Sequence, residues 1–178
     1  LGYDFGDVNT YASFTHGYKS GGFNLDTTAA AGGADPRFAS EEVDAYEIGV
    51  KGRFMDDAVT ANLALFHEEF TNFQVLEFTG AQFQTFNVPK AESTGFELET
   101  QIRPTDGLNI NAALTYVDAS YPSDCADTGD ALRVQNLCGN PLTNAPKLVA
   151  ILGATYRGDI GDSLGWFING QIRSESDR

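Results

Sequence analysis

The chain has 178 residues, of which 42% are hydrophobic and 20% are charged. No run of about 18 apolar residues occurs, which excludes a transmembrane helix, and the composition is not that of a disordered chain. The formal net charge of -14 argues against nucleic-acid binding, because that function requires a basic surface.

Seven stretches alternate between apolar and polar residues with a period of two, which predicts β-strands. In the clearest of them, ESTGFELETQIRP (92–104), one face would be apolar and the other charged. The 13 phenylalanines, 7 tyrosines and 19 glycines also favour an all-β fold. In chain order, the predicted strands lie near residues 8–19, 43–54, 58–76, 84–103, 108–121, 147–157 and 163–173.

The connections between these strands alternate in length. In an antiparallel meander, alternate connections lie at the same end of the sheet, so one rim would carry short turns and the other long loops. A Greek-key sandwich gives no reason for that regularity. The short connections are 55–57, 104–107 and 158–162, and the longer ones are 20–42, 77–83 and 122–146.

The last predicted strand contains Asn169-Gly170, a dipeptide that is a strong hairpin signal in other sequences. A hairpin at this point would divide the strand into short pieces. We therefore expect Gly170 to lie within the strand, with the hairpin as the alternative.

Two folds would suit a sheet with one apolar and one polar face. A soluble, secreted β-sandwich, acting as a binding module or adhesin, would bury the apolar face against a second sheet. A membrane barrel would turn the apolar face to lipid and the polar face to a wet lumen. The stretch from Val59 to Leu76 contains no Gly or Pro, so it is far longer than the usual strand of about 5–6 residues. We therefore predict an antiparallel, up-and-down transmembrane β-barrel segment.

The barrel interpretation assigns a side to each residue of the alternating pattern. Aromatic residues such as Tyr46 and Phe54 lie eight positions apart on one face, a rise of roughly 20 Å that approaches the height of the lipid-facing band. The residues expected to face lipid are Tyr46, Ile48, Val50, Phe54, Phe96, Leu98, Ile102, Leu114, Tyr116, Tyr156 and Trp166. Those expected to face the lumen are Glu47, Lys51, Glu97, Glu99 and Arg103.

Five segments, in their order along the chain, resemble the TonB-dependent outer-membrane receptors. The resemblance covers nearly the whole chain and lies in the second half of that family's barrel. The segments are YASFTHGYKSGGFN, DAYEIGVKGRF, VTANLALFHEEFTNFQV, NVPKAESTGFELETQIRPTDGLNINAALTYVDASY and NPLTNAPKLVAILGATY.

The resemblance implies a 22-stranded barrel, closed by an N-terminal plug, in the outer membrane of a Gram-negative bacterium. Residues 1–178 would be a partial barrel domain of about seven strands, without the plug domain and the C-terminal strands. The implied function is active import of a scarce nutrient, such as a ferric siderophore, with energy relayed by TonB. The implied partners are outer-membrane lipid and lipopolysaccharide, TonB through the absent N-terminal part, and the small-molecule ligand. Neither an enzymatic activity nor a cofactor is implied.

Cys125 and Cys138 are the only cysteines, and both lie in the long connection after Tyr121. A disulfide there would stabilise the loop by about 3 kcal/mol in the chain-entropy model. An oxidising cell surface permits the bond, and the alternative is a pair of free thiols. A zinc site is not expected, because no histidine is near these cysteines in the sequence.

Four aspartates in or near the same connection suggest a calcium site. Their spacing matches no EF-hand loop, and acidic residues in exposed loops are usually solvated. We therefore expect solvated carboxylates, with calcium as the alternative. The residues are Asp118, Asp124, Asp127 and Asp130.

Catalysis has little support in the sequence. His16 and His67 belong to no recognisable nucleophile or metal motif. Glu97 and Glu99 project to one face as a glycosidase pair might, but lumen-facing carboxylates are ordinary in a barrel.

Four residues of the long connections could meet an anionic ligand. Solvated loop charge is the alternative for each of them. They are Lys19, Arg37, Tyr121 and Arg133.

Overall fold

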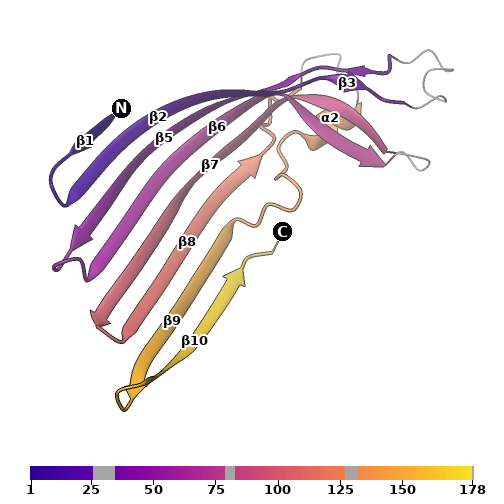
Figure 1. Cartoon of the computed structure of the whole chain (residues 1–178). Coiled ribbons are helices and arrows are strands. Elements are labelled where there is room, and N and C mark those ends of the chain that lie inside the picture. The colour runs from indigo at the N-terminus through magenta and orange to yellow at the C-terminus, as the bar shows by residue number, and fades with distance from the viewer. Residues whose placement is uncertain (26–34, 79–82, 127–131, 178) are drawn as a thin grey trace.

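The computed structural model describes residues 1–25, 35–78, 83–126 and 132–177. Eight strands form one antiparallel sheet, and along it every strand pairs with the neighbouring strands of the meander (Figure 1). Across the sheet these are β1 (Gly2–Asp4), β2 (Val8–Lys19), β5 (Glu41–Phe54), β6 (Val59–Phe78), β7 (Phe83–Thr105), β8 (Leu108–Ser120), β9 (Leu148–Ile160) and β10 (Leu164–Glu175).

All seven predicted strands are present, and their ends differ from the prediction by three residues at most. The prediction omitted β1, because three residues are too few to show a period. It also treated as plain loop three short elements: β3 (Gly22–Phe23), β4 (Arg37–Phe38) and the helix α2 (Leu132–Leu137). None of the described helices is long or apolar enough to cross a membrane.

The expectation of an unbroken last strand is confirmed. Asn169 and Gly170 lie within β10, opposite Thr155 and Ala154 of β9. Asn169 Nδ2 also donates a hydrogen bond to Thr155 Oγ1 at 2.8 Å. The hairpin alternative is wrong, because both residues lie inside a continuous strand that pairs with β9 and do not form a turn.

As the sequence predicted, one end of the sheet carries short turns and the other end carries long connections. Short turns join β5 to β6, β7 to β8 and β9 to β10 at one end, and the long connections with β3 and α2 lie at the other (Figure 1). In the first of these turns, Met55, Asp56 and Asp57 all have a positive φ, between 54° and 66°. Aspartate tolerates this left-handed conformation better than most residues, because its short side chain can bond to nearby backbone.

Strand register puts apolar and polar residues on opposite faces of the sheet. One row across β2 and β5–β9 reads Thr10, Val50, Leu63, Leu98, Leu114 and Ala150. The next row reads Asn9, Lys51, Asn62, Glu99, Ala113 and Ile151.

The apolar face is uncovered. Ile48 is 56% exposed and Leu65 is 45% exposed, although both lie in the middle of long strands. Apart from the eight-stranded sheet, the described residues form only the two-stranded sheet of β3 and β4. The β-sandwich alternative is therefore wrong, since no second sheet packs against the apolar face.

Aromatic rings lie over glycines at several points and help to fix the register of the strands. The ring of Tyr11 occupies the space where a Cβ on Gly49 would stand, and these two residues are paired across β2 and β5. Likewise, a Cβ on Gly158 would lie 2.7 Å from Trp166, its partner across β9 and β10. A glycine at these positions gives the neighbouring ring a place on the sheet that any side chain would fill.

The buried core lies at the loop end of the sheet. Its centre is the outer part of the β6–β7 hairpin together with the connection between β8 and β9. This connection packs against the hairpin. Together they form a small packed layer, here called the loop layer, at the end of a sheet that has no buried core of its own. The buried residues are Val88, Ala91, Tyr121, Cys125 and Val134.

Candidate functional site: two sheet faces and a loop layer

Aromatic pairs mark both ends of the apolar face. Toward the loops, the rings of Phe14 and Tyr46 lie 5.2 Å apart between centroids. Toward the turns, the rings of Tyr156 and Trp166 lie 5.6 Å apart. Aliphatic rows fill the space between, and strand register puts all eleven residues that were predicted to face lipid on this face.

A polar band follows the apolar face on the loop side. His16 Nδ1 lies 2.7 Å from Asp44 Oδ1 across β2 and β5, and His67 Nδ1 lies 2.7 Å from Thr94 Oγ1 across β6 and β7. His67 also stacks on Tyr46, with ring centroids 6.5 Å apart. Both histidines are thus bonded to neighbouring strands, and neither faces a serine or cysteine nucleophile in these contacts.

The polar face carries a connected group of charged side chains. Lys51 Nζ lies 5.4 Å from the centroid of the Tyr11 ring, and the Tyr11 hydroxyl hydrogen-bonds to the Glu47 carboxylate. Glu97 and Glu99 line the same shallow hollow as these three residues. Glu47, Lys51, Glu97 and Glu99, four of the residues predicted to face a lumen, therefore share one face.

Arg103, the fifth residue predicted to face a lumen, lies near the turn end of the polar face. Its Nη2 donates a hydrogen bond to Gln101 Oε1 at 3.2 Å, although a shift in register follows Ile102. Arg103 and Arg157 line a hollow of about 740 Å³ beside the turn between β7 and β8. Asp56, Asp57 and Asp106 line the same hollow, so its two guanidinium groups stand among carboxylates.

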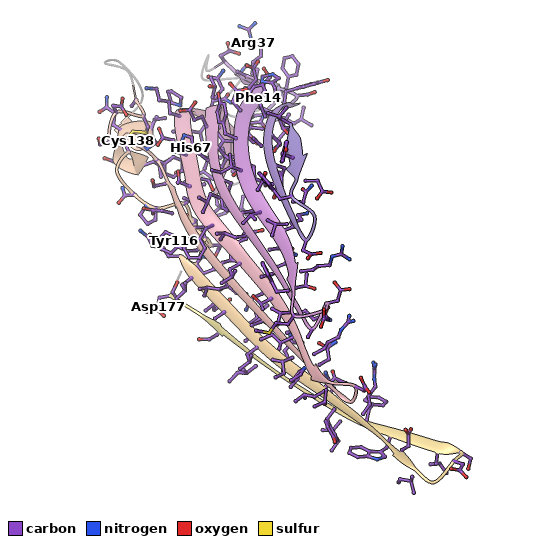
Figure 2. The ribbon with its side chains drawn as sticks, turned by 90° about the vertical axis from the view of Figure 1, so that its left-hand side faces the viewer. Phe14, Arg37, His67, Tyr116, Cys138 and Asp177 are labelled. Carbon is purple, nitrogen blue, oxygen red and sulfur yellow. A yellow bond between two sulfur atoms is a disulfide. The ribbon has the colours of Figure 1, made fainter. Side chains whose placement is uncertain are left out.

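The two cysteines form a disulfide. The sulfurs of Cys125 and Cys138 are 1.92 Å apart and the Cα atoms are 5.4 Å apart. Cys125 is 1% exposed and belongs to the buried core, and Cys138 follows directly after α2. Figure 2 shows Cys138 at the loop end of the sheet, whereas Tyr116 lies farther toward the turns.

The residues proposed to contact an anionic ligand have different surroundings. Lys19 is exposed at the end of β2. Arg37 is exposed at the loop end (Figure 2), but its guanidinium already holds Asp35, with Nη2 to Oδ2 at 2.7 Å and Nε to Oδ1 at 2.9 Å. The same pair lowers the pKa of Asp35 to about 2. Arg133 lies in α2, and its side chain is outside the described part of the structure.

Tyr121 is not placed as the sequence suggested. Its side chain is only 6% exposed, and its ring packs edge-on against Phe73 at 6.1 Å between centroids. Burial raises the pKa of the Tyr121 phenol. Tyrosine is amphipathic and suits a buried site as well as a ligand surface, and here it stabilises the loop layer rather than facing a ligand.

Of the four aspartates considered for calcium, the structure describes two, and each of these pairs with a lysine. Asp118 Oδ1 pairs with Lys147 Nζ at 2.8 Å, and Asp124 Oδ2 lies 3.4 Å from Lys90 Nζ. Asp127 and Asp130 lie outside the described residues. Within the described part of the chain, no group of three or more His, Cys, Asp or Glu residues could hold a metal ion.

Comparison with known proteins agrees with this two-faced sheet. Residues 1–177 match the family described as "TonB dependent receptor-like, beta-barrel". This chain belongs to the TonB-dependent receptor family. The expected fold class is confirmed with it, although the barrel is not closed by these strands alone.

Receptors from several bacteria resemble this TonB-dependent receptor chain. The "Probable TonB-dependent siderophore receptor PiuA" of Acinetobacter baumannii is 31% identical over 119 residues, which are 66% of this chain and 16% of PiuA. The "Metal-pseudopaline receptor CntO" of Pseudomonas aeruginosa is 28% identical over 151 residues, which are 84% of this chain and 19% of CntO.

The fold also matches solved receptors. The ferric yersiniabactin uptake receptor FyuA from Yersinia pestis superposes with a TM-score of 0.69 over 90% of this chain and 22% of FyuA, at 24% identity. This TonB-dependent receptor chain therefore spans about a fifth of the length of its relatives. As TonB-dependent receptors of Gram-negative bacteria are outer-membrane proteins, the outer membrane is the location of this chain.

Sequence reasoning missed one group of polar residues in this receptor. The side-chain amides of Asn24, Gln74 and Asn87 join the connection before β5 to the β6–β7 hairpin. Asn24 and its partner Thr85 are 61 positions apart in the chain. No local pattern signals such a contact, because amides are common in loops for many reasons.

Proposed function

We propose that this chain is part of an outer-membrane transporter that imports a ferric siderophore or a similar metal complex, with energy relayed by TonB. The observation that carries the proposal is the two-faced sheet of a TonB-dependent receptor, with an exposed apolar face bounded by aromatic pairs. Two relatives, a probable TonB-dependent siderophore receptor and a metal-pseudopaline receptor, support a metal complex as the cargo.

We propose that the apolar face contacts outer-membrane lipid and that its loop-side edge meets lipopolysaccharide. Burying an exposed aliphatic face in water would need a second sheet, whereas lipid covers it without one. The pair Phe14–Tyr46 would lie at the loop-side interface and the pair Tyr156–Trp166 at the turn-side interface. The eleven residues on this face, from Tyr46 to Trp166, would be the lipid contacts.

The polar face would then line the lumen of a closed barrel, which we propose to have 22 strands and a plug. Residues 1–178 would supply one sector of that barrel. Both edges of the sheet support this, because β1 and β10 each pair on one side only within the described residues. Backbone groups left unpaired in hydrocarbon would cost several kcal/mol each, so neighbouring strands must complete the barrel.

Uptake in whole cells tests the proposed function. A strain without the gene for the complete receptor would be compared with its parent for uptake of radioactive iron from a panel of ferric siderophores under iron limitation. We expect uptake of at least one complex to fall to background in the mutant and to return with the cloned gene. Loss of TonB should abolish the same uptake in the parent.

A matched control separates transport from a general defect in the membrane. Uptake of a small sugar through open porins should be the same in parent and mutant. The proposal is wrong if no metal complex depends on the receptor, or if uptake persists at the parental rate without TonB.

A further inference from the structure

Side-chain amides join the first long connection to the outer part of the β6–β7 hairpin. Asn24 Nδ2 donates to the backbone oxygen of Thr85 at 2.7 Å, and the Thr85 N–H donates to Asn24 Oδ1 at 2.7 Å. The amide of Asn24 thus pairs with Thr85 as a backbone peptide of a neighbouring strand would. Both hydrogen bonds are partly buried, which limits competition from water.

Asn87 makes a second contact of the same kind. Its Oδ1 accepts the Ala39 N–H at 2.7 Å, and its Nδ2 donates to the Ala39 oxygen at 3.1 Å. The same Nδ2 donates to the Asn72 oxygen at 2.6 Å. One side chain therefore holds the first connection and both strands of the hairpin.

The position of Asn72 explains why the hairpin needs this bond. Register runs from Thr71 opposite Lys90 to Phe73 opposite Val88, so Asn72 stands opposite Pro89. Proline has no N–H to donate, and Asn72 adopts a left-handed φ of 54°. The Asn87 amide gives the Asn72 carbonyl a donor at the place where β7 cannot supply one.

Gln74 adds a third contact. Its backbone N–H donates to Glu41 Oε2 at 2.7 Å, and its Nε2 donates to the oxygens of Ser20 and Ala39, both at 3.0 Å. Ser20 and Ala39 flank the first connection near its two ends. Gln74 therefore holds both ends of the first connection next to β6.

The hairpin is also packed on its other side. Phe73 precedes Gln74 in β6, and Val88 follows Asn87 in β7. Phe73 and Val88 pack in the core formed with the connection between β8 and β9. Val88 is fully buried there. Successive residues of a strand point to opposite faces, so amides hold one face of the hairpin and the core holds the other.

We propose that residues 20–25, 35–40, 72–78 and 83–89 form one rigid unit, held by an amide clamp of Asn24, Gln74 and Asn87. These described parts of the first connection and of the β6–β7 hairpin would then move as one body instead of as two independent segments. The extracellular placement of this unit rests on the proposed function, whereas its rigidity does not. In a transporter, such a unit would make the loops respond together when ligand enters.

Hydrogen exchange in the complete receptor, purified in detergent micelles, tests the clamp. Three backbone N–H groups report on it, because those of Ala39, Gln74 and Thr85 each donate to a side chain of another segment. In the native receptor all three should be protected. In Asn87→Ala, which removes the acceptor of only the Ala39 N–H, exchange should rise about tenfold or more at all three sites.

Two further variants keep the test sharp. Asn87→Asp keeps the acceptor for Ala39 but loses both donors, so its exchange rates should lie between those of the native receptor and of Asn87→Ala. Asn169→Ala removes an amide bonded to Thr155 in β9 and should leave Ala39, Gln74 and Thr85 unchanged.

The proposal is overturned if the Ala39 N–H is unprotected in the native receptor. It is equally overturned if Asn87→Ala changes Ala39 alone, since the contacts would then be local and independent. The exchange rates do not depend on whether the receptor imports a metal complex. The amide clamp and the proposed transport function can therefore be disproved independently.

Discussion

At the scale of single residues, the face of the sheet on which a residue lies should decide how much a charged substitution there lowers the free energy of unfolding. Leu98 stands on the apolar face between Leu63 and Leu114. We expect Leu98→Arg to destabilise the receptor by about 2–4 kcal/mol if the site lies near mid-membrane, because a guanidinium in hydrocarbon loses its hydration. Denaturant unfolding of the complete receptor in lipid vesicles would measure the loss.

Ala113 provides the matched control. It lies on the polar face opposite Glu99, one residue before Leu114. Ala113→Arg should change the free energy of unfolding by no more than about 0.5 kcal/mol, because the new charge is hydrated and beside a carboxylate. Equal losses for Leu98→Arg and Ala113→Arg would contradict the assignment of the two faces.

Gly49 should accept no side chain while Tyr11 lies over it. A Cβ at position 49 would occupy the space of the Tyr11 ring, so Gly49→Val should destabilise the receptor by about 1–3 kcal/mol. Truncating the ring removes the clash, so Gly49→Val combined with Tyr11→Ala should cost less than the sum of the two single changes. A double-mutant cycle on unfolding free energies checks this, and strict additivity would refute the packing argument.

Asp35 should titrate far below an ordinary aspartate. The Arg37 side chain, which hydrogen-bonds to it, lowers its pKa from 3.8 to about 2. A depressed pKa means that the pair is intact above pH 3.8 and is lost as the pH falls toward 2. A carbon-13 titration of the Asp35 carboxyl should give the low value in the native receptor and the ordinary value in Arg37→Gln. An ordinary value in both proteins would show that the pair does not form in solution.

The faces of these residues could be predicted from the sequence, whereas most of their partners could not. A period of two is local, so Leu98 and Glu99 reveal their opposite sides without any knowledge of the fold. Contacts such as Asn24 with Thr85 join distant segments and have no local signature. Tyr121 was misjudged because the sequence gives its place at the end of a strand but not the core that covers it.

At the scale of elements, the β8–β9 connection should depend on its disulfide. Cys125 and Cys138 are 13 positions apart, and closing a loop of that size contributes about 3 kcal/mol in the chain-entropy model. In Cys125→Ser, we expect a protease to cut this connection much faster than in the native receptor, with the barrel strands still intact. Titration of thiols in the folded, unreduced receptor should find none from these cysteines, and free thiols would refute the bond.

Long elements were predictable and short ones were not. β6 and β7 are each at least 20 residues long and contain stretches of alternating apolar and polar residues, so they can be predicted even though Pro89 lies inside β7. β3 and β4 have two residues each, so their pairing depends on the neighbouring hairpin and not on a pattern of their own. α2 has six residues and is held by the core around Val134.

At the scale of the whole molecule, the 178 residues should not behave as an independent soluble domain. Among the described residues, the sheet has one uncovered apolar face and two edges without a further strand, which invites aggregation. We expect the isolated segment to precipitate in water or to require detergent, and to show no cooperative thermal transition by circular dichroism. A soluble monomer with sharp two-state melting would contradict this expectation.

The disulfide also has a consequence for the order of events in biogenesis. Both cysteines lie inside a single connection, so the ring that they close contains no residue of the sheet. Oxidation therefore requires no strand pairing, and the periplasm is oxidising enough to permit it. The connection can thus become a closed ring while the chain is still on its way to the membrane. If the long connections are extracellular, as the proposed function has them, this closed ring must cross the membrane when β8 and β9 insert.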